Sequence, residues 1–147
     1  MSNSSVKSIL FVCTGNSCRS QMAEGWVRKL KSNILVPHSA GIEKHGIDPK
    51  AVKVMAEVGV DISKQQSKLI SELSQKDFDY VVTICNGANE KCPIFPGKAK
   101  RLHHGFDNPP ILSKKTKSDE EALAIYRRVR DEIRDFVENM PNNLYSV

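Results

Sequence analysis

An apolar segment that stops abruptly at a polar loop is the feature that most constrains the fold of this chain. Residues 9–12 are continuously apolar, and the loop 13–19 follows them directly. Such a run is typical of a strand that is buried on both faces of a parallel sheet. Helical spacing of apolar residues then begins and predicts a first helix over residues 20–31. The chain therefore opens with a strand, a loop and a helix.

The remainder of the chain repeats this alternation of strands and helices. The pattern predicts further strands at 34–36, 80–84 and 101–103, and helices at 49–58, at 69–73 and from Ser118 onward, with a loop at 105–117. Alternation of this kind predicts an α/β fold with a four-stranded parallel sheet flanked by helices. Residues 1–147 are expected to form a single domain whose ends, 1–5 and 141–147, are frayed.

Length and composition set limits on the class of protein. A chain of 147 residues with 39% hydrophobic residues can bury one core without disulfide or metal staples. None of its apolar runs approaches the roughly 20 residues that span a bilayer, and the short polar start, 1–7, has no signal-peptide core behind it, so we expect a cytoplasmic protein. We also expect a monomer. Four cysteines in such a chain favour redox chemistry or metal binding over structural disulfides.

The net charge of +5 suits a small anionic substrate, and by itself it would also suit nucleic acid. The basic residues are spread along the chain, with the densest cluster at Lys98, Lys100 and Arg101, and aromatic residues make up only 6%. Surfaces that bind nucleic acid interleave aromatic rings with basic groups, and this sequence does not. We therefore expect neither a nucleic-acid nor a membrane partner.

The first loop has what a thiolate needs to attack a tetrahedral oxyanion. Cys13 and Arg19 lie six positions apart in it. Backbone N–H groups and the positive end of the following helix can hold oxyanion oxygens, and the Arg19 fork can bind two of them. The same field favours the thiolate form of Cys13, which a hydrogen bond from Ser20 would assist. The predicted oxyanion-binding residues are Thr14, Gly15, Asn16, Ser17, Cys18, Arg19 and Ser20.

A cysteine and an arginine at this spacing also arise by chance, and the alternative is a buried cysteine in a turn after a strand. The position of the motif favours catalysis. It lies at the carboxyl end of the first strand and before the first helix, where open α/β sheets bind their ligands.

Residues 12–26 (Val-Cys-Thr-Gly-Asn-Ser-Cys-Arg-Ser-Gln-Met-Ala-Glu-Gly-Trp) resemble the arsenate reductases of the low-molecular-weight tyrosine phosphatase superfamily. Phosphatases proper typically have a proline after the Arg-Ser pair, where this chain has Gln21. The resemblance continues through 39–43, 45–46, 57–63, 85–93, 104–107 and 127–133. It implies a low-molecular-weight tyrosine phosphatase-like fold, reduction of arsenate to arsenite in arsenic detoxification, and residual phosphatase activity.

The resemblance also implies the order of the chemistry. Cys13 takes arsenate, Cys85 attacks as arsenite leaves, and Cys92 relays the disulfide outward to thioredoxin, with no bound cofactor. Phosphate and sulfate are the expected competing oxyanions. If the segment between Cys85 and Cys92 is helical, their Cα atoms lie about 10 Å apart, beyond the roughly 7 Å limit for a disulfide. The disulfide would therefore require local unwinding.

Two alternatives concern these cysteines. In the first, Cys85 is simply a buried residue at a strand end. In the second, Cys85 and Cys92 ligate zinc with His103 or His104. The six residues between the two cysteines fit poorly with the two to four that usually separate zinc ligands. The competing functions are hydrolysis of phosphotyrosine and a sensor of oxyanions or redox state. Hydrolysis requires only the oxyanion loop and an acid, so the two additional cysteines favour the reductase.

Asp107 matches the family's general acid, which protonates the leaving oxygen. The alternative role is to cap a turn before proline. The sequence departs from the family nearby, with His104 for Trp, Asn108 for Asp and Pro110 for Ala. Cys18 is expected to pack beneath the loop, and an off-pathway disulfide with Cys13 is its other possible role.

Some thioredoxin-coupled relatives hold a potassium ion beside the oxyanion loop. Three of the positions that bind it match Asn16, Glu24 and Ser39, but Lys68 replaces the fourth, an acid. Either the Lys68 ammonium turns inward and bonds to Glu24 and Asn16, or it points to water and the site is lost. No resident metal ion is expected.

Overall fold

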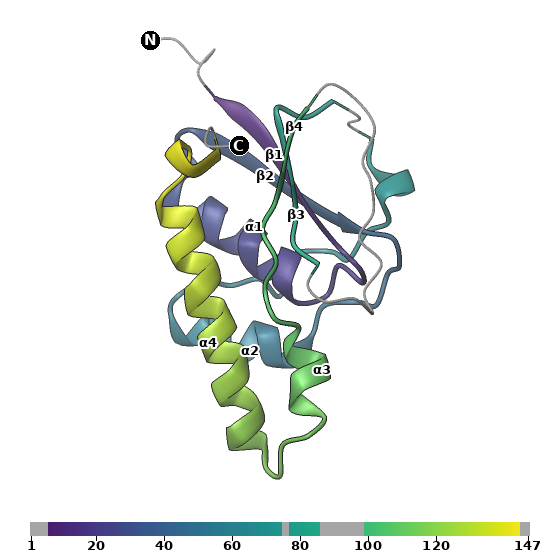
Figure 1. Ribbon diagram of the computed structural model, residues 1–147, viewed down its shortest axis with the longest axis vertical. Coiled ribbons are helices and arrows are strands. Elements are labelled where there is room, and N and C mark those ends of the chain that lie inside the picture. Colours follow the sequence, from purple (N-terminus) through teal and green to yellow (C-terminus); the bar gives the residue numbers. More distant parts are fainter. Residues whose placement is uncertain (1–5, 75–76, 86–98, 145–147) are drawn as a thin grey trace.

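Four parallel strands form a sheet in the order β2-β1-β3-β4 (Figure 1). The computed structural model describes residues 6–74, 77–85 and 99–144. The strands are β1 (Lys7–Cys13), β2 (Leu35–Gly41), β3 (Tyr80–Thr83) and β4 (Lys100–His103). The continuously apolar β1 is central, as the sequence predicts, and it pairs with both β2 and β3. The carboxyl ends of these three strands therefore meet at one edge of the sheet.

The helices of the described residues are α1 (Arg19–Leu30), α2 (Pro49–Glu57), α3 (Pro109–Ser113) and α4 (Asp119–Glu138), with 3-10 turns η2 (Ile70–Glu72) and η3 (Asn142–Leu144). Two of these four helices, α2 and α4, begin at a residue whose side chain caps them. The Asp48 carboxylate accepts the Lys50 N–H ahead of Pro49, which is the preferred arrangement at a helix start. Ser118 caps α4 in the same way. No helix of the described residues is long and apolar enough to cross a membrane.

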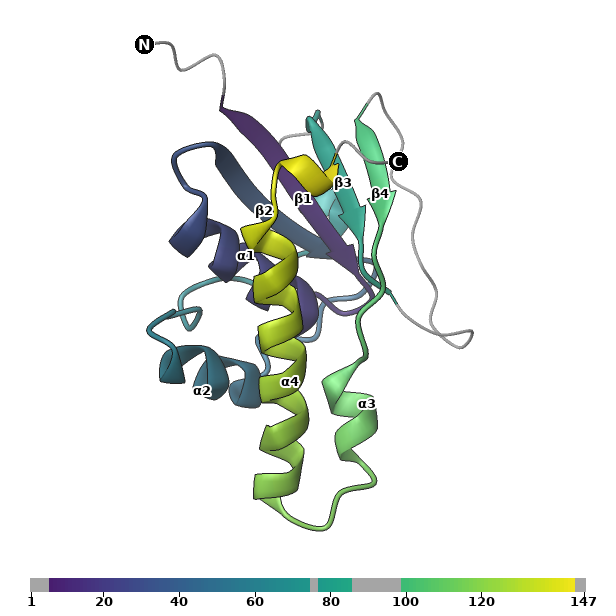
Figure 2. The ribbon, with the colours of Figure 1, turned by 60° about the vertical axis from the view of Figure 1, so that its left-hand side comes forward.

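The sheet separates two apolar clusters, because successive side chains of a strand point to opposite faces. Ile9 and Phe11 of β1 belong to the larger cluster, which includes residues of α1, α2 and α4. Leu10 and Val12 point the other way, toward Leu73 and others around η2. Figure 2 shows α1, α2 and α4 on the same side of the sheet.

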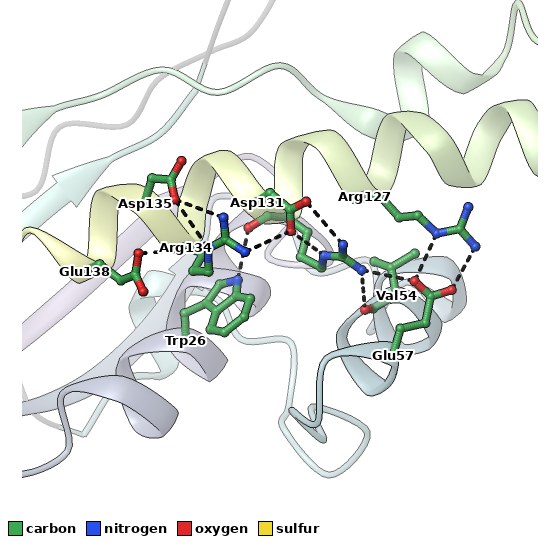
Figure 3. Close-up of polar contacts among 9 residues, drawn as sticks. Trp26, Val54, Glu57, Arg127, Asp131, Arg134, Asp135 and Glu138 are labelled. Atoms are coloured by element: carbon green, nitrogen blue, oxygen red, sulfur yellow. Dashed lines mark hydrogen bonds and ion pairs between the residues drawn. The ribbon is translucent and has the colours of Figure 1, made fainter.

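Polar contacts fix α4 against α1 and α2 (Figure 3). The Trp26 indole N–H donates to the Arg130 carbonyl at 3.1 Å, and the Arg130 guanidinium donates to the Val54 carbonyl at 3.0 Å. Arg127 binds both carboxylate oxygens of Glu57, at 2.9 and 2.8 Å. Bidentate pairs of this kind hold a defined geometry. These contacts join the three helices into one layer on a single face of the sheet.

Three expectations about secondary structure require correction. The strand predicted at 34–36 continues to Gly41; β2 has an edge position, where Pro37 is tolerated because its missing N–H interrupts no ladder. The predicted loop 105–117 contains α3, which packs beside α4. Residues 141–144 are not frayed, since 142–144 form η3 and Leu144 is fully buried.

Other expectations lie outside the described residues. Cys92 and the helix proposed between Cys85 and Cys92 belong to the segment 86–98. The remaining terminal residues, 1–5 and 145–147, lie outside as well.

Candidate active site

A cavity of about 440 Å³ opens at the carboxyl edge of the sheet. One wall is the loop after β1, and five of the predicted oxyanion-binding residues line it: Thr14, Gly15, Ser17, Cys18 and Arg19. Asn16 and Ser20 are fully buried behind this wall. The opposite wall comes from segments distant in sequence, with Ile42, Glu43, His45, Asn108, Pro110, Ile111 and Lys114.

Cys13 lies at the end of β1 and lines the cavity, although only 2% of the residue is exposed. Its Sγ is 2.9 Å from the Ser20 hydroxyl oxygen. That oxygen accepts a hydrogen bond from the Asn16 amide at 2.8 Å. Because Ser20 is an acceptor for Asn16, its own proton is available for a hydrogen bond to the sulfur.

Asn16 shapes the loop. Its φ of 49° is in the left-handed region, which asparagine tolerates better than most residues. The Asn16 side-chain oxygen accepts the backbone N–H of Lys68 at 2.7 Å. A residue 52 positions away thus holds the strained loop residue in place.

Arg19 is 97% buried at the first position of α1 and connects three parts of the site. Its guanidinium donates to the carbonyls of Ile84, at 3.2 Å, and Phe106, at 3.0 Å. These residues immediately precede Cys85 and Asp107. The predicted oxyanion-binding arginine is therefore anchored to the segment that carries the predicted second cysteine and to the segment that carries the predicted acid.

Cys85 follows β3 at the same sheet edge as Cys13. The Ile84 N–H donates to the Val12 carbonyl at 3.0 Å, which continues the ladder between β1 and β3 to the edge. Cys85 is 3% exposed. The two cysteines thus lie at the carboxyl ends of adjacent parallel strands, Cys13 as the last residue of β1 and Cys85 two residues beyond β3. The third cysteine of the predicted relay, Cys92, lies outside the described residues.

Asp107 lies beside the cavity but does not line it. Its carboxylate accepts a hydrogen bond from Arg128 of α4 at 2.9 Å, and this ion pair is nearly half exposed. The neighbouring Asn108 does line the cavity. For Asp107 to act as an acid, its loop must turn the carboxylate away from Arg128 and toward the cavity.

Cys18 packs beneath the loop, as the sequence predicts, and only 3% of it is exposed. Burial raises the pKa of this thiol well above its ordinary value, and the negative charges of Asp48 and the Cys13 thiolate raise it further against the opposing effect of Arg19. Cys18 therefore remains a neutral thiol and does not compete as a nucleophile.

The inward orientation considered for Lys68 is wrong. Its ammonium donates to the carbonyl of Gln66, at 2.9 Å. The Glu24 carboxylate instead accepts hydrogen bonds from Ser39 at 2.6 Å and Arg28 at 2.7 Å. Lys68 contacts Asn16 through its backbone N–H, and the Glu24 carboxylate pairs with Arg28, one turn along α1. Within the described part of the chain, no cluster of His, Cys, Asp or Glu side chains is arranged to hold a metal ion.

Sequence reasoning missed the residues that close the cavity from outside the loop. A Cβ at Gly41 would lie 2.7 Å from the Thr14 carbonyl and 2.9 Å from the Asn16 nitrogen, so only glycine allows β2 to approach the loop. His45 packs over Gly15 and pairs with Glu43 at 2.7 Å. The family resemblance extends through 39–43 and 45–46 but gave these residues no role, because that role arises from chain segments that meet only in the fold.

Comparison with known proteins shows the family to which the chain belongs. The family model of the low molecular weight phosphotyrosine protein phosphatases matches residues 8–145. The chain is 51% identical to an arsenate reductase of Halalkalibacterium halodurans over 127 residues, which are 86% of this chain and 89% of the relative.

Two solved structures extend the comparison. An arsenate reductase in its phosphate-binding state superposes with a TM-score of 0.73 and 30% identity, and the alignment covers 95% of this chain and 99% of the other. A thioredoxin-dependent arsenate reductase of Corynebacterium glutamicum gives a TM-score of 0.57 and 25% identity, covering 93% of this chain and 64% of the other. The chain therefore belongs to the low molecular weight phosphotyrosine protein phosphatase family, together with these arsenate reductases.

Proposed function

We propose that this protein reduces arsenate to arsenite in the cytoplasm, as a step of arsenic detoxification, with electrons from thioredoxin. The observation that carries the proposal is the placement of two buried cysteines, Cys13 and Cys85, at the carboxyl ends of adjacent parallel strands, with Arg19 anchored beside both. The similarity to arsenate reductases at about half identity supports the substrate. A thioredoxin-dependent structural relative supports the reductant.

The first step is nucleophilic attack on arsenate. The Cys13 thiolate forms a bond to arsenic while the bond from arsenic to one arsenate hydroxyl breaks, and that hydroxyl takes a proton from Asp107 and leaves as water. Arg19 and the loop N–H groups bind the remaining oxygens and balance their negative charge. Ser20 stabilises the thiolate before attack through the hydrogen bond described above.

The second step transfers two electrons to arsenic. The Cys85 thiolate attacks Cys13 Sγ, a disulfide forms between the two, and the S–As bond breaks with its electron pair remaining on arsenic as arsenite. Cys92 then attacks Cys85, which frees Cys13 and leaves a Cys85–Cys92 disulfide. The thioredoxin dithiol reduces that disulfide, so no resident cofactor is required.

Arsenate-dependent consumption of NADPH with thioredoxin and thioredoxin reductase tests this proposal. Cys13→Ser, Cys85→Ser and Cys92→Ser should each abolish turnover, while Cys18→Ser should retain most of it because that thiol is buried and neutral. Glutathione with glutaredoxin should not replace thioredoxin. Near wild-type cycling by Cys92→Ser would show that Cys92 is not the exit point of the relay.

A second activity, slow hydrolysis of aryl phosphates, is expected at the same cavity because phosphate and arsenate share shape and charge. Hydrolysis uses the oxyanion loop and the acid but not the relay. We predict that Cys85→Ser and Cys92→Ser retain p-nitrophenyl phosphate hydrolysis to within about twofold, whereas Cys13→Ser and Arg19→Ala lose at least about 100-fold. Loss of hydrolysis in a folded Cys92→Ser protein would contradict the division between the two chemistries.

A further inference from the structure

A continuous row of side-chain hydrogen bonds connects the surface of α1 to the Cys13 thiol. In order, its members are Arg28, Gln65, Gln21, Asn16, Ser20 and Cys13. The outer half begins at the Arg28 guanidinium, which donates to the Gln65 side-chain oxygen. The Gln65 amide nitrogen donates to the Gln21 side-chain oxygen at 2.8 Å.

The inner half continues in the same direction. The Gln21 amide nitrogen donates to the Asn16 side-chain oxygen at 3.0 Å. The Asn16 amide nitrogen donates to Ser20, whose hydroxyl lies 2.9 Å from the Cys13 sulfur. Asn16, Ser20 and Gln21 are completely buried, so water does not compete for these bonds.

The direction of the row is imposed by the backbone. An amide side chain can be rotated so that its nitrogen and oxygen exchange places. The amides of Gln65, Gln21 and Asn16, however, each have a backbone partner that permits a single orientation. The Gln65 nitrogen donates to the Gln21 carbonyl at 3.0 Å, and the Gln21 nitrogen donates to the Gln66 carbonyl at 3.0 Å. The Asn16 oxygen accepts the Lys68 N–H. Each amide therefore accepts on the side of Arg28 and donates on the side of Cys13.

Arg28 begins the row because a guanidinium has donors and no acceptor. It also pairs with Glu24, whose side chain is 8% exposed, so much of its charge is balanced locally. What Arg28 contributes is a charged donor that polarises Gln65, and aligned hydrogen bonds polarise one another along a chain. The last donor, Ser20, faces the atom on which negative charge must be stabilised.

We propose that Arg28 and Gln65 are positioning residues that stabilise the Cys13 thiolate through this polarised row. Neither residue lines the cavity. The inference rests on Cys13 as the nucleophile of the proposed function, but its test requires no arsenate turnover. An experiment can therefore contradict the role of this row of hydrogen bonds without contradicting the reductase proposal, and the reverse.

The decisive variant is Gln65→Glu. A glutamate has nearly the same shape and retains the acceptor for Arg28, but it has no N–H for Gln21. The measurement is the rate of Cys13 alkylation by iodoacetamide across pH, read by tandem mass spectrometry. We expect a roughly threefold lower rate at pH 7, with the midpoint moved upward by about half a pH unit.

The matched control is Gln66→Glu, which adds the same charge one residue along. Its exposed side chain makes no hydrogen bond within the described residues, so its alkylation profile should match wild type. The charged or titratable groups sharing the cavity with Cys13 are unchanged in both variants; they are Cys18, Arg19, Glu43, His45 and Lys114. Equal profiles for Gln65→Glu and Gln66→Glu would overturn the proposal.

A second pair of variants keeps the test decisive if Gln65→Glu fails to fold. Arg28→Met removes the first donor from the half-exposed surface of α1, and Lys29→Met removes one charge from an exposed neighbour. Arg28→Met should lower Cys13 alkylation about threefold, and Arg28→Lys should restore most of the rate because lysine is also a charged donor. If Arg28→Met shows the same pH profile of Cys13 alkylation as wild type, Arg28 does not stabilise the Cys13 thiolate.

Discussion

At the scale of single residues, the reactivity of Cys13 depends on neighbours that come from distant segments. Ser20 and Arg19 belong to the same loop and helix, but Gly41 of β2 is equally necessary for the loop's shape. The Gly41 N–H donates to the Lys68 carbonyl at 2.8 Å, and the Lys68 N–H in turn holds Asn16. The oxyanion loop is thus supported by two segments that do no chemistry.

Gly41→Ala should therefore damage the site more than the fold. Its Cβ would meet backbone atoms of residues 14, 16 and 43, which cannot move without deforming the loop. We expect phosphate affinity, measured by calorimetry, to fall at least about tenfold with a stability loss of about 1–3 kcal/mol. Gly25→Ala is the control, because it crowds the Ile62 side chain at 2.6 Å in the core and should lower stability without changing affinity. Unchanged phosphate affinity in Gly41→Ala would show that the loop tolerates the displacement.

At the scale of elements, α4 both supports the helical layer and holds the candidate acid. Consecutive arginines face different partners: Arg127 binds Glu57 of α2, and Arg128 binds Asp107 of the loop before α3. Through these two ion pairs, α4 contacts both α2 and the loop that carries Asp107. These two roles give separate predictions.

The Arg127–Glu57 pair predicts a specific response to acid. Hydrogen bonds from Arg127 lower the pKa of Glu57 to about 2. Because the folded-state pKa lies below the unfolded value of about 4.3, the stabilisation is fully present above roughly pH 5 and disappears as pH falls toward 2. Glu57→Gln should lower the Tm by about 2–4 °C at pH 7, and the difference from wild type should shrink at pH 3. An equal Tm difference at both pH values would contradict this role.

The Arg128–Asp107 pair holds the acid away from the cavity. Exposed pairs contribute about 0–1 kcal/mol, so Arg128→Ala should raise kcat for aryl phosphate hydrolysis by at most about fivefold. Arg134→Ala changes the same helix by the same charge and should have no effect. If Asp107→Asn slows hydrolysis but Arg128→Ala does not accelerate it, release of the pair does not limit the reaction. If neither variant changes the rate, Asp107 is not the acid.

At the scale of the whole molecule, we expect oxyanion binding and folding to be coupled. The cavity is lined by β1 and its loop, by the segment after β2 and by α3 with its flanking residues. Arg19 is in addition anchored to the segments after β3 and β4. Phosphate at 100 times its Kd should stabilise the native state by about 2.7 kcal/mol. For a chain of this size that corresponds to a rise in Tm of roughly 5–10 °C. Arg19→Ala should abolish the rise, as measured by calorimetry, while Lys115→Ala should retain it. A rise that persists in Arg19→Ala would place the bound oxyanion elsewhere.

The sequence by itself determined the features that depend on consecutive residues. The apolar run of β1, the helical spacing of α1 and the caps at Asp48 and Ser118 are local patterns, and each predicted its element correctly within a few residues. The loop between Cys13 and Arg19 was recognisable for the same reason, because its chemistry requires a short spacing after a strand. Parallel topology then brought Cys85 to the edge where Cys13 lies.

Only the tertiary structure decided which distant side chains complete the site. Whether Lys68 or Arg28 binds Glu24, whether Asp107 faces the cavity or Arg128, and whether β2 continues to Gly41 all depend on segments far apart along the chain. The burial of Leu144 and the presence of α3 depend on packing in the same way. The periodicity of apolar residues predicts which face of an element is buried, but it does not predict which other element packs against that face. That choice is made by the packing free energy of the whole fold, in which several polar partners compete for one carboxylate or one amide.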